Sequence, residues 1–180
     1  MARAMRWVLV LLVVTLAGCA SGVKQADDPN RRAAYFSGGG KVAQDVSLSL
    51  SKEAQAKLAD NLKFDQEKLL GTVRRALDAK GMLAKAPDPA LPRIEIVITD
   101  IRVRSNFSAV MFGFMAGNDS VTGDVIARGA DGKEIQRFSV SASYALGGLA
   151  GGQDDARMGW LYETFAQHTV EELSGTKKQP

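Results

Sequence analysis

Residues 93–103 read Arg-Ile-Glu-Ile-Val-Ile-Thr-Asp-Ile-Arg-Val, the strongest strand pattern in the sequence. The isoleucines at positions 94, 96 and 98 alternate with other residues, which predicts a β-strand with one fully buried face. The alternation changes phase at Asp100, after which Ile101 and Val103 take the apolar positions. We therefore expect a β-bulge near Thr99 and Asp100, and the remaining elements should pack against the isoleucine face.

The segment before this strand predicts a strand followed by helices. Val42 to Leu50 alternates between apolar and polar residues and is expected to be a half-buried strand. A short helix is expected from Ser51 to Asn61. A longer helix should begin after Asp65 as N-cap and end at Gly81. Its apolar side chains recur on one face: Leu69, Leu70, Val73, Ala76 and Leu77.

The segment after the strand predicts a hairpin and a closing helix. Two alternating runs, Val121 to Ala127 and Phe138 to Tyr144, flank Asp131-Gly132, a strong hairpin turn signal. A helix should follow from Asp154-Asp155, whose carboxylates favour a helix start, and stop at Gly175. Its apolar face comprises Met158, Leu161, Phe165, Thr169 and Leu173.

This order of elements predicts an α+β two-layer sandwich with a four-stranded, mainly antiparallel sheet and two main helices on one face. The first strand–helix–strand crossover is long enough to make its two strands parallel, so the sheet should be mixed. We expect residues 41–175 to form a single domain, followed by a polar tail at residues 176–180.

The first 18 residues have the parts of an export signal. Arg3 and Arg6 precede an apolar run from Trp7 to Leu16, and small residues then lead to Cys19. The sequence Leu16-Ala17-Gly18-Cys19 resembles the lipobox of bacterial lipoproteins. The resemblance implies cleavage between Gly18 and Cys19, a diacylglycerol group on the Cys19 sulfur, and an acyl chain such as palmitate on its amine. An ordinary secretory signal with an incidental cysteine is the alternative.

A lipid on Cys19 would anchor the protein to a membrane stably, because two or more acyl chains suffice for this. We expect residues 19–40 to be a flexible tether, because they are rich in Ser, Gly, Asp, Asn and Arg. The lipoprotein resemblance, with Ala20 in place of Asp after the cysteine, implies the periplasmic face of the outer membrane.

Composition restricts the chemistry that the chain could perform. Cys19 is its only cysteine and His168 its only histidine, which argues against zinc sites and cysteine nucleophiles. The formal charge is +3, but removal of Arg3 and Arg6 would leave 21 basic and 20 acidic residues (23 − 2 = 21). A nucleic-acid partner needs a clustered basic patch, and we expect none. We also expect no metal and no cofactor beyond the covalent lipid.

Candidate catalytic groups are few. Asp154, Asp155 and Glu163 could act as paired carboxylates, but helix-start charge and a solvated helix face explain them better. His168 falls at the edge of the buried helix face, with no serine or cysteine nucleophile motif beside it. The glycines at Ser37 to Lys41 precede a strand, so they are typical of a linker rather than a phosphate-binding loop.

An apolar segment, Phe107 to Gly117, has no obvious place in this plan. Eleven residues are too few to span a bilayer. Its large side chains should either plug one end of the core or form a patch for a partner or the lipid interface. We expect mixed behaviour, with at least one side chain exposed among Met111, Phe112, Phe114 and Met115.

Taken together, the mature chain resembles a family of short bacterial lipoproteins known as domain of unknown function 4410. The residues that carry the resemblance are Gly81, the isoleucine strand, Gly113 to Gly117, Asp131-Gly132-Lys133, the Gly147 to Gly152 loop and the closing helix. The chain is also similar in plan to periplasmic domains of envelope lipoproteins that regulate penicillin-binding proteins or assist curli secretion. The resemblance implies fold and compartment and supplies no catalytic residue.

We therefore expect a non-enzymatic binding or assembly module, anchored in the cell envelope, with an envelope protein as partner. Handling of lipid or polysaccharide in a groove is the alternative. A hydrolase that uses Asp154, Asp155 and His168 is a weaker one.

Overall fold

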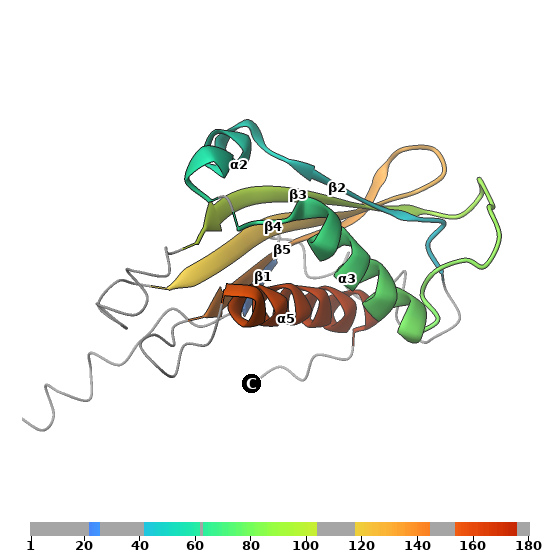
Figure 1. The fold of residues 1–180 in the computed structure, drawn as a ribbon. Helices are drawn as coiled ribbons and strands as arrows, with labels where there is room; N and C mark the ends of the chain where they lie inside the picture. Colours follow the sequence, from blue (N-terminus) through green and yellow to red (C-terminus); the bar gives the residue numbers. More distant parts are fainter. Residues whose placement is uncertain (1–21, 26–41, 62, 104–117, 145–153, 176–180) are drawn as a thin grey trace, which may run out of the picture.

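The computed structural model describes residues 22–25, 42–61, 63–103, 118–144 and 154–175 (Figure 1). The elements in these ranges run in the following order: β1 (Gly22–Gln25), β2 (Val46–Leu50), α2 (Lys52–Ala56), a 3-10 turn η1 (Leu58–Asp60), α3 (Gln66–Ala79), β3 (Arg93–Arg102), β4 (Asp119–Arg128), β5 (Glu134–Tyr144) and α5 (Asp154–Ser174). The α+β class predicted from the sequence is confirmed.

The strands form one five-stranded sheet in the order β1-β5-β4-β3-β2. β2 and β3 pair in parallel, because α3 carries the chain back along the sheet between them, and the other neighbours are antiparallel. The predicted mixed sheet is therefore present, with one strand more than expected.

The additional strand is β1, which places residues 22–25 of the predicted tether in the sheet, whereas residues 19–21 and 26–40 lie outside the described ranges. Gly22–Gln25 pairs antiparallel with β5, with Gly22 opposite Ser141 and Gln25 opposite Phe138. Val23 packs against the core, and it is the only apolar residue in the strand. Periodicity could not reveal a strand held mainly by backbone hydrogen bonds to its neighbour.

The isoleucine strand lies inside the sheet, between β2 and β4. Ile94, Ile96 and Ile98 are at most 1% exposed, and the register with β4 shifts between Ile98 and Asp100. Thr99 is the extra residue, so the expected bulge is confirmed. The bulge returns Ile101 to the buried face opposite Val121, which explains the change of phase in the sequence.

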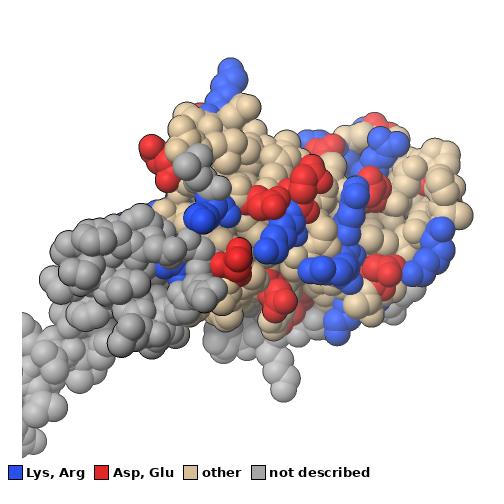
Figure 2. Space-filling view, viewed as in Figure 1, with Lys and Arg blue, Asp and Glu red and all other residues tan. Residues whose placement is uncertain are grey.

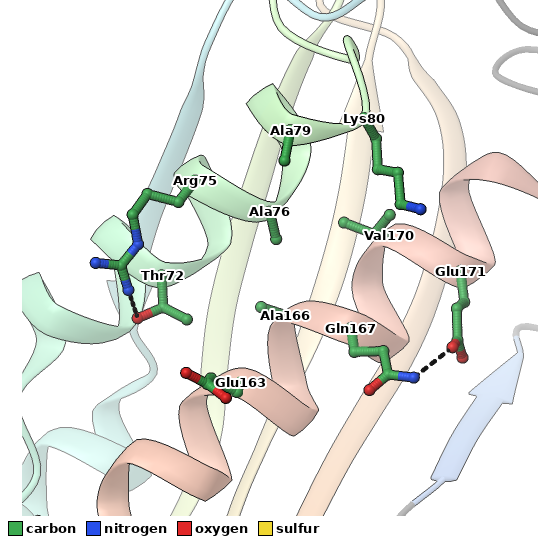
Figure 3. A pocket seen from close by; sticks show the side chains of 10 residues that line it. All are labelled: Thr72, Arg75, Ala76, Ala79, Lys80, Glu163, Ala166, Gln167, Val170 and Glu171. Atoms are coloured by element: carbon green, nitrogen blue, oxygen red, sulfur yellow. Dashed lines mark hydrogen bonds between the residues drawn. The ribbon is translucent and has the colours of Figure 1, made fainter.

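Helices α3 and α5 cover one face of this sheet and run side by side in the same direction (Figures 1 and 3). Asp65 caps α3, since its Oδ1 accepts a hydrogen bond from the Lys68 N–H at 2.9 Å. Gly81, with φ +64°, ends the same helix in a conformation that favours glycine. The buried side of α5 contributes Met158, Leu161, Tyr162, Phe165, Ala166, Val170 and Leu173 to the core.

Tyr162 joins the two helices at the start of α3. Its hydroxyl oxygen accepts a hydrogen bond from the Asp65 N–H at 2.7 Å, and Phe64 meets its ring edge-to-face at 6.0 Å. Burial raises the pKa of Tyr162 to about 12, against an opposing effect of the Asp65 hydrogen bond. The neutral tyrosine is therefore part of the packed core.

Candidate functional site: the open face of the sheet

The sheet face opposite the helices is lined mainly by polar side chains. These residues alternate along each strand with the buried apolar ones, because successive side chains of a strand point to opposite faces. The alternation of polar residues along the strands is visible in the sequence, but it did not predict a binding site. The polar positions are Ser47, Ser49, Glu95, Thr99, Thr122, Asp124, Arg128, Arg137, Ser139 and Ser141.

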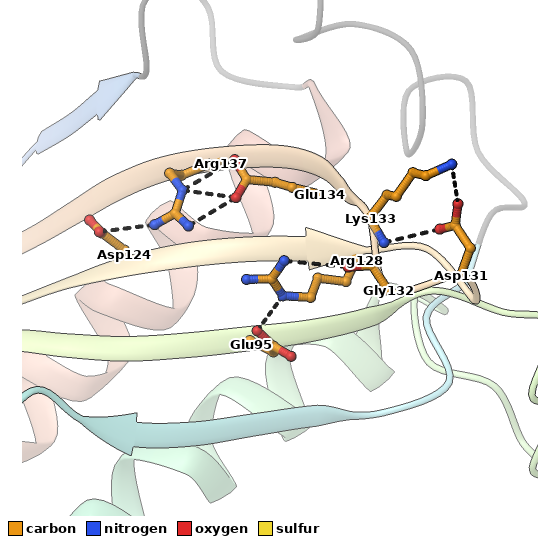
Figure 4. Close-up of polar contacts among 8 residues, drawn as sticks. All are labelled: Glu95, Asp124, Arg128, Asp131, Gly132, Lys133, Glu134 and Arg137. Carbon is orange, nitrogen blue, oxygen red and sulfur yellow. Dashed lines mark hydrogen bonds and ion pairs between the residues drawn. The ribbon is translucent and has the colours of Figure 1, made fainter.

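Arg137 is the centre of a network on this face (Figure 4). Its guanidinium donates to both carboxylate oxygens of Glu134, at 2.9 to 3.2 Å, and to Asp124 at 3.3 Å. The Ser139 hydroxyl donates to the other Asp124 oxygen at 2.5 Å. These bonds with Glu134 raise the pKa of Arg137, so the cation persists at any physiological pH.

A second ion pair lies beside the first and crosses from β4 to β3. Arg128 Nε donates to Glu95 Oε2 at 2.6 Å, and the two side chains are 33% and 41% exposed. Each exposed pair of this kind contributes roughly 0.2–1 kcal/mol to stability. Ordering side chains on association costs free energy. Ion pairs that already hold these side chains in place would lower that cost for a binding partner.

Ile126 lies between these pairs, in register with Glu95 on one side and Arg137 on the other. It is 3% exposed although it lies outside the main core cluster. The open face therefore combines a buried apolar residue with fixed charges of both signs around it.

Two shallow depressions mark this face near the β4–β5 turn, and they share Arg93 and Glu95. One, of about 360 Å³, is also lined by Gln44, Asp45 and Ser47. The other, of about 200 Å³, is also lined by Arg128 and by the turn around Gly129. Both offer charged groups and hydrogen-bonding atoms at the surface, which suits recognition of a polar partner.

A larger groove of about 600 Å³ runs between α3 and α5 (Figure 3). Its floor contains small or apolar residues, including Ala76, Ala166 and Val170, and its rim contains Arg75, Lys80, Glu163 and Glu171. Within it, Gln167 donates to Glu171 at 2.7 Å. The groove can accommodate an amphipathic group, with acidic and basic side chains on its borders.

A buried ion pair that the sequence analysis missed lies at the opposite end of the sheet from the hairpin turn. Arg157 of α5 approaches Asp119 of β4, Nε to Oδ2, at 3.4 Å, and their side chains are 2% and 0% exposed. The pair could not be inferred from the sequence, because its members are 38 positions apart (157 − 119) and look like ordinary surface charges.

The proposed catalytic residues are not gathered into one site. Asp155 and His168 are thirteen positions apart on α5, which separates them by about 20 Å along the helix axis. Asp154 begins α5, and Glu163 borders the groove instead. His168 is 19% exposed, with its Nδ1 3.6 Å from Glu171 Oε2, as expected for an edge-of-core histidine.

Other predicted residues fall outside the described ranges. They are Gly18, Cys19, Met111, Phe112, Phe114 and Met115. The residues that flank the apolar segment, Val103 and Asn118, lie at the sheet end where β3 finishes and β4 starts.

Within the described residues, His, Cys, Asp and Glu form no group of three that could hold a metal ion. None of the helices in this part of the chain combines the length and the apolarity needed to cross a bilayer. Basic and acidic side chains are interspersed over the side seen in Figure 2.

The fold and the open face together define a small α+β domain with a polar sheet surface. Residues 23–148 match the family described as "Domain of unknown function (DUF4410)". The chain therefore belongs to this family. No curated protein matches the chain at a significant level.

Solved structures that resemble this chain include two of PelC from Paraburkholderia phytofirmans, both described as dodecamers. One, a leucine-to-methionine variant in space group C2, is 14% identical, with a TM-score of 0.49 over 86% of this chain and 98% of that one. The other, in space group P6, is 12% identical, with a TM-score of 0.46 over 89% and 100%. Protein XCC0632 from Xanthomonas campestris, of family DUF330, is 12% identical, with a TM-score of 0.47 over 89% and 94%.

Proposed function

We propose that the protein is a lipid-anchored lipoprotein of the cell envelope that binds an envelope protein on the periplasmic face of the outer membrane, without catalysis. The anchor is the acylated Cys19 that the lipobox pattern implies. The binding surface is the open face of the sheet. The family match is consistent with this proposal but assigns no activity.

The observation that carries the proposal is the fixed charge network on the open face. Arg137 is held by two carboxylates, Glu134 and Asp124, and Arg128 is held by Glu95. Arginine is enriched in protein interfaces, where its planar group forms paired hydrogen bonds. A surface of ordered, partly exposed ion pairs suits recognition better than acid–base chemistry, because its charges are already paired.

Site-specific photo-crosslinking in whole cells tests this function. A photoreactive amino acid at Ser47 or Ser49, both exposed on the open face, is expected to yield one dominant protein adduct. The matched control position is Glu67, which is exposed on α3 on the helix side. It should yield little or none of the same adduct.

Substitution of the network refines this test. Arg137→Gln should weaken the adduct formed from Ser47 several-fold while the protein stays folded, because the pairs on this face contribute little to stability. Absence of any protein adduct from Ser47 and Ser49, with anchored and folded protein present, would contradict the proposed binding face.

Handling of lipid or polysaccharide is the second candidate, and the α3–α5 groove favours it. A photoreactive group at Lys80, exposed at the groove rim, would then form adducts with lipid or glycan. Lipid or glycan adducts from Lys80, without a protein adduct from the open face, would favour handling of lipid or polysaccharide over binding of a protein.

A further inference from the structure

An aromatic pair, an exposed tryptophan beside a partly buried tyrosine, lies at the end of the sheet that is remote from the hairpin turn. Trp160 of α5 is 43% exposed, and it is the large apolar side chain left exposed among the described residues. Its ring centroid is 5.2 Å from that of Tyr144, the last residue of β5. Trp and Tyr have an apolar body and a polar tip, which suits them to the interface between membrane and water.

Strand β1 brings the expected lipid anchor to this same end. Because β1 and β5 are antiparallel and Gly22 pairs with Ser141, the first residue of β1 is the one nearest the Tyr144 end of β5. Cys19 lies three positions before Gly22, and three residues can span at most about 11 Å. A lipid on Cys19 would thus be held close to the sheet rather than at the end of a long tether.

We propose that the Tyr144–Trp160 end of the domain rests on the membrane surface into which the acyl chains of Cys19 insert. This inference rests on the proposed lipid anchor. The acyl chains supply the affinity, and the aromatic pair sets the orientation. The exposed charges described at this end have both signs, with Asp155 near the start of α5 and Arg102 at the end of β3, so the contact is expected with zwitterionic headgroups.

This orientation places the polar depressions away from the lipid. β5 extends over eleven residues from Glu134 to Tyr144, a length of about 34 Å. The β4–β5 turn, with Arg128 and the second depression beside it, would therefore point into the periplasm. The protein would present its charged face at a fixed height above the membrane.

Tryptophan fluorescence can test the contact directly. The sequence contains two tryptophans, Trp7 and Trp160, so Trp160 is the only one after removal of residues 1–18. The lipidated protein, purified from membranes, is reconstituted into phosphatidylethanolamine-rich vesicles with or without brominated acyl chains. We expect bromine to lower Trp160 emission about twofold.

The matched control moves the tryptophan to the other end of the sheet. The double variant Trp160→Phe, Lys133→Trp carries its only mature tryptophan on the β4–β5 turn, where the Lys133 side chain is 85% exposed. Its emission should be the same in both kinds of vesicle. Equal quenching of the two proteins would overturn the proposed orientation.

Mass spectrometry of the same samples separates this inference from the proposed function. If Cys19 carries its lipid and Trp160 is not quenched, the membrane contact is wrong and the anchored lipoprotein stands. If Cys19 is not acylated, the proposed anchor itself fails, and this inference fails with it.

Discussion

Arg157 and Asp119 form a buried interior ion pair whose disruption should strongly destabilise the domain. Arg157→Met leaves the Asp119 carboxylate buried without this cation, a change that costs about 3–5 kcal/mol in buried pairs. Replacing both, as Arg157→Met with Asp119→Leu, should restore most of that stability. Urea unfolding of the two variants measures the difference, and a double variant no more stable than the single one would contradict the pairing.

The burial of Tyr162 should make the free energy of unfolding fall at alkaline pH. Its pKa is raised to about 12 in the folded protein, whereas an unfolded tyrosine ionises near 10. The unfolded chain loses the proton first, so this contribution to stability is complete below about pH 10 and is lost as pH rises toward 12.

Tyr162→Phe should reduce that alkaline loss while costing about 1 kcal/mol at neutral pH, because the Asp65 N–H loses its acceptor. Urea unfolding at pH 8 and at pH 11 separates the two effects. If the free energy of unfolding of Tyr162→Phe falls between pH 8 and pH 11 by as much as that of the wild type, Tyr162 is not the source of the alkaline loss.

At the scale of elements, two glycines provide contrasting sites for substitution by alanine. A Cβ at Gly123 of β4 would lie 2.9 Å from Ile98 Cδ1 and 3.0 Å from the Val97 carbonyl oxygen, whereas one at Gly71 of α3 meets nothing within 4 Å. Gly123→Ala should therefore destabilise the domain by about 1–3 kcal/mol. Gly71→Ala should stabilise it by up to about 1 kcal/mol, because alanine favours the helix.

Thermal unfolding of both glycine variants measures these shifts. Opposite signs are expected, and a stabilised Gly123→Ala protein would mean that β3 and β4 do not approach as closely as described. The pair tests the packing between the isoleucine strand and its neighbour.

The edge strand β2 shows how one side of the sheet is protected from pairing with other strands. Arg74 of α3 donates to the Val46 carbonyl at 2.9 Å, and Gln66 donates to the Leu48 carbonyl at 3.1 Å. These side chains occupy acceptors that an added strand would need. A partner is therefore expected on the face of the sheet rather than along the β2 edge.

The sequence predicted well the elements that local signals specify. Apolar alternation specified the isoleucine strand, and cap and turn residues specified the ends of α3 and the hairpin turn: Asp65, Gly81 and Asp131-Gly132. Strand β1 was missed because Val23 alone gives no periodicity. Its stability comes from pairing with β5, which is more than 100 positions away.

The candidate site was harder to predict for the same reason. Glu95, Arg128 and Arg137 look like ordinary solvent-facing charges in the sequence, and only the strand register brings them together. The buried Arg157–Asp119 pair is also a product of tertiary contact. A polar residue on a strand does not by itself indicate which partner on the next strand it will meet.

At the scale of the whole molecule, the domain has two different ends. The Tyr144–Trp160 end is expected to face the membrane, and the end with the β4–β5 turn is expected to carry the polar face toward a partner. Both expectations depend on the lipid at Cys19, because the acyl chains are the proposed source of membrane affinity.

The most direct measurement is therefore metabolic labelling of cells with an alkyne fatty acid, comparing the wild type with Cys19→Ala. We expect label on the wild-type protein, recovered in the outer-membrane fraction, and no label on the Cys19→Ala protein. Label that persists in Cys19→Ala, or a wild type that acquires none, would contradict the lipid anchor on which both proposals depend.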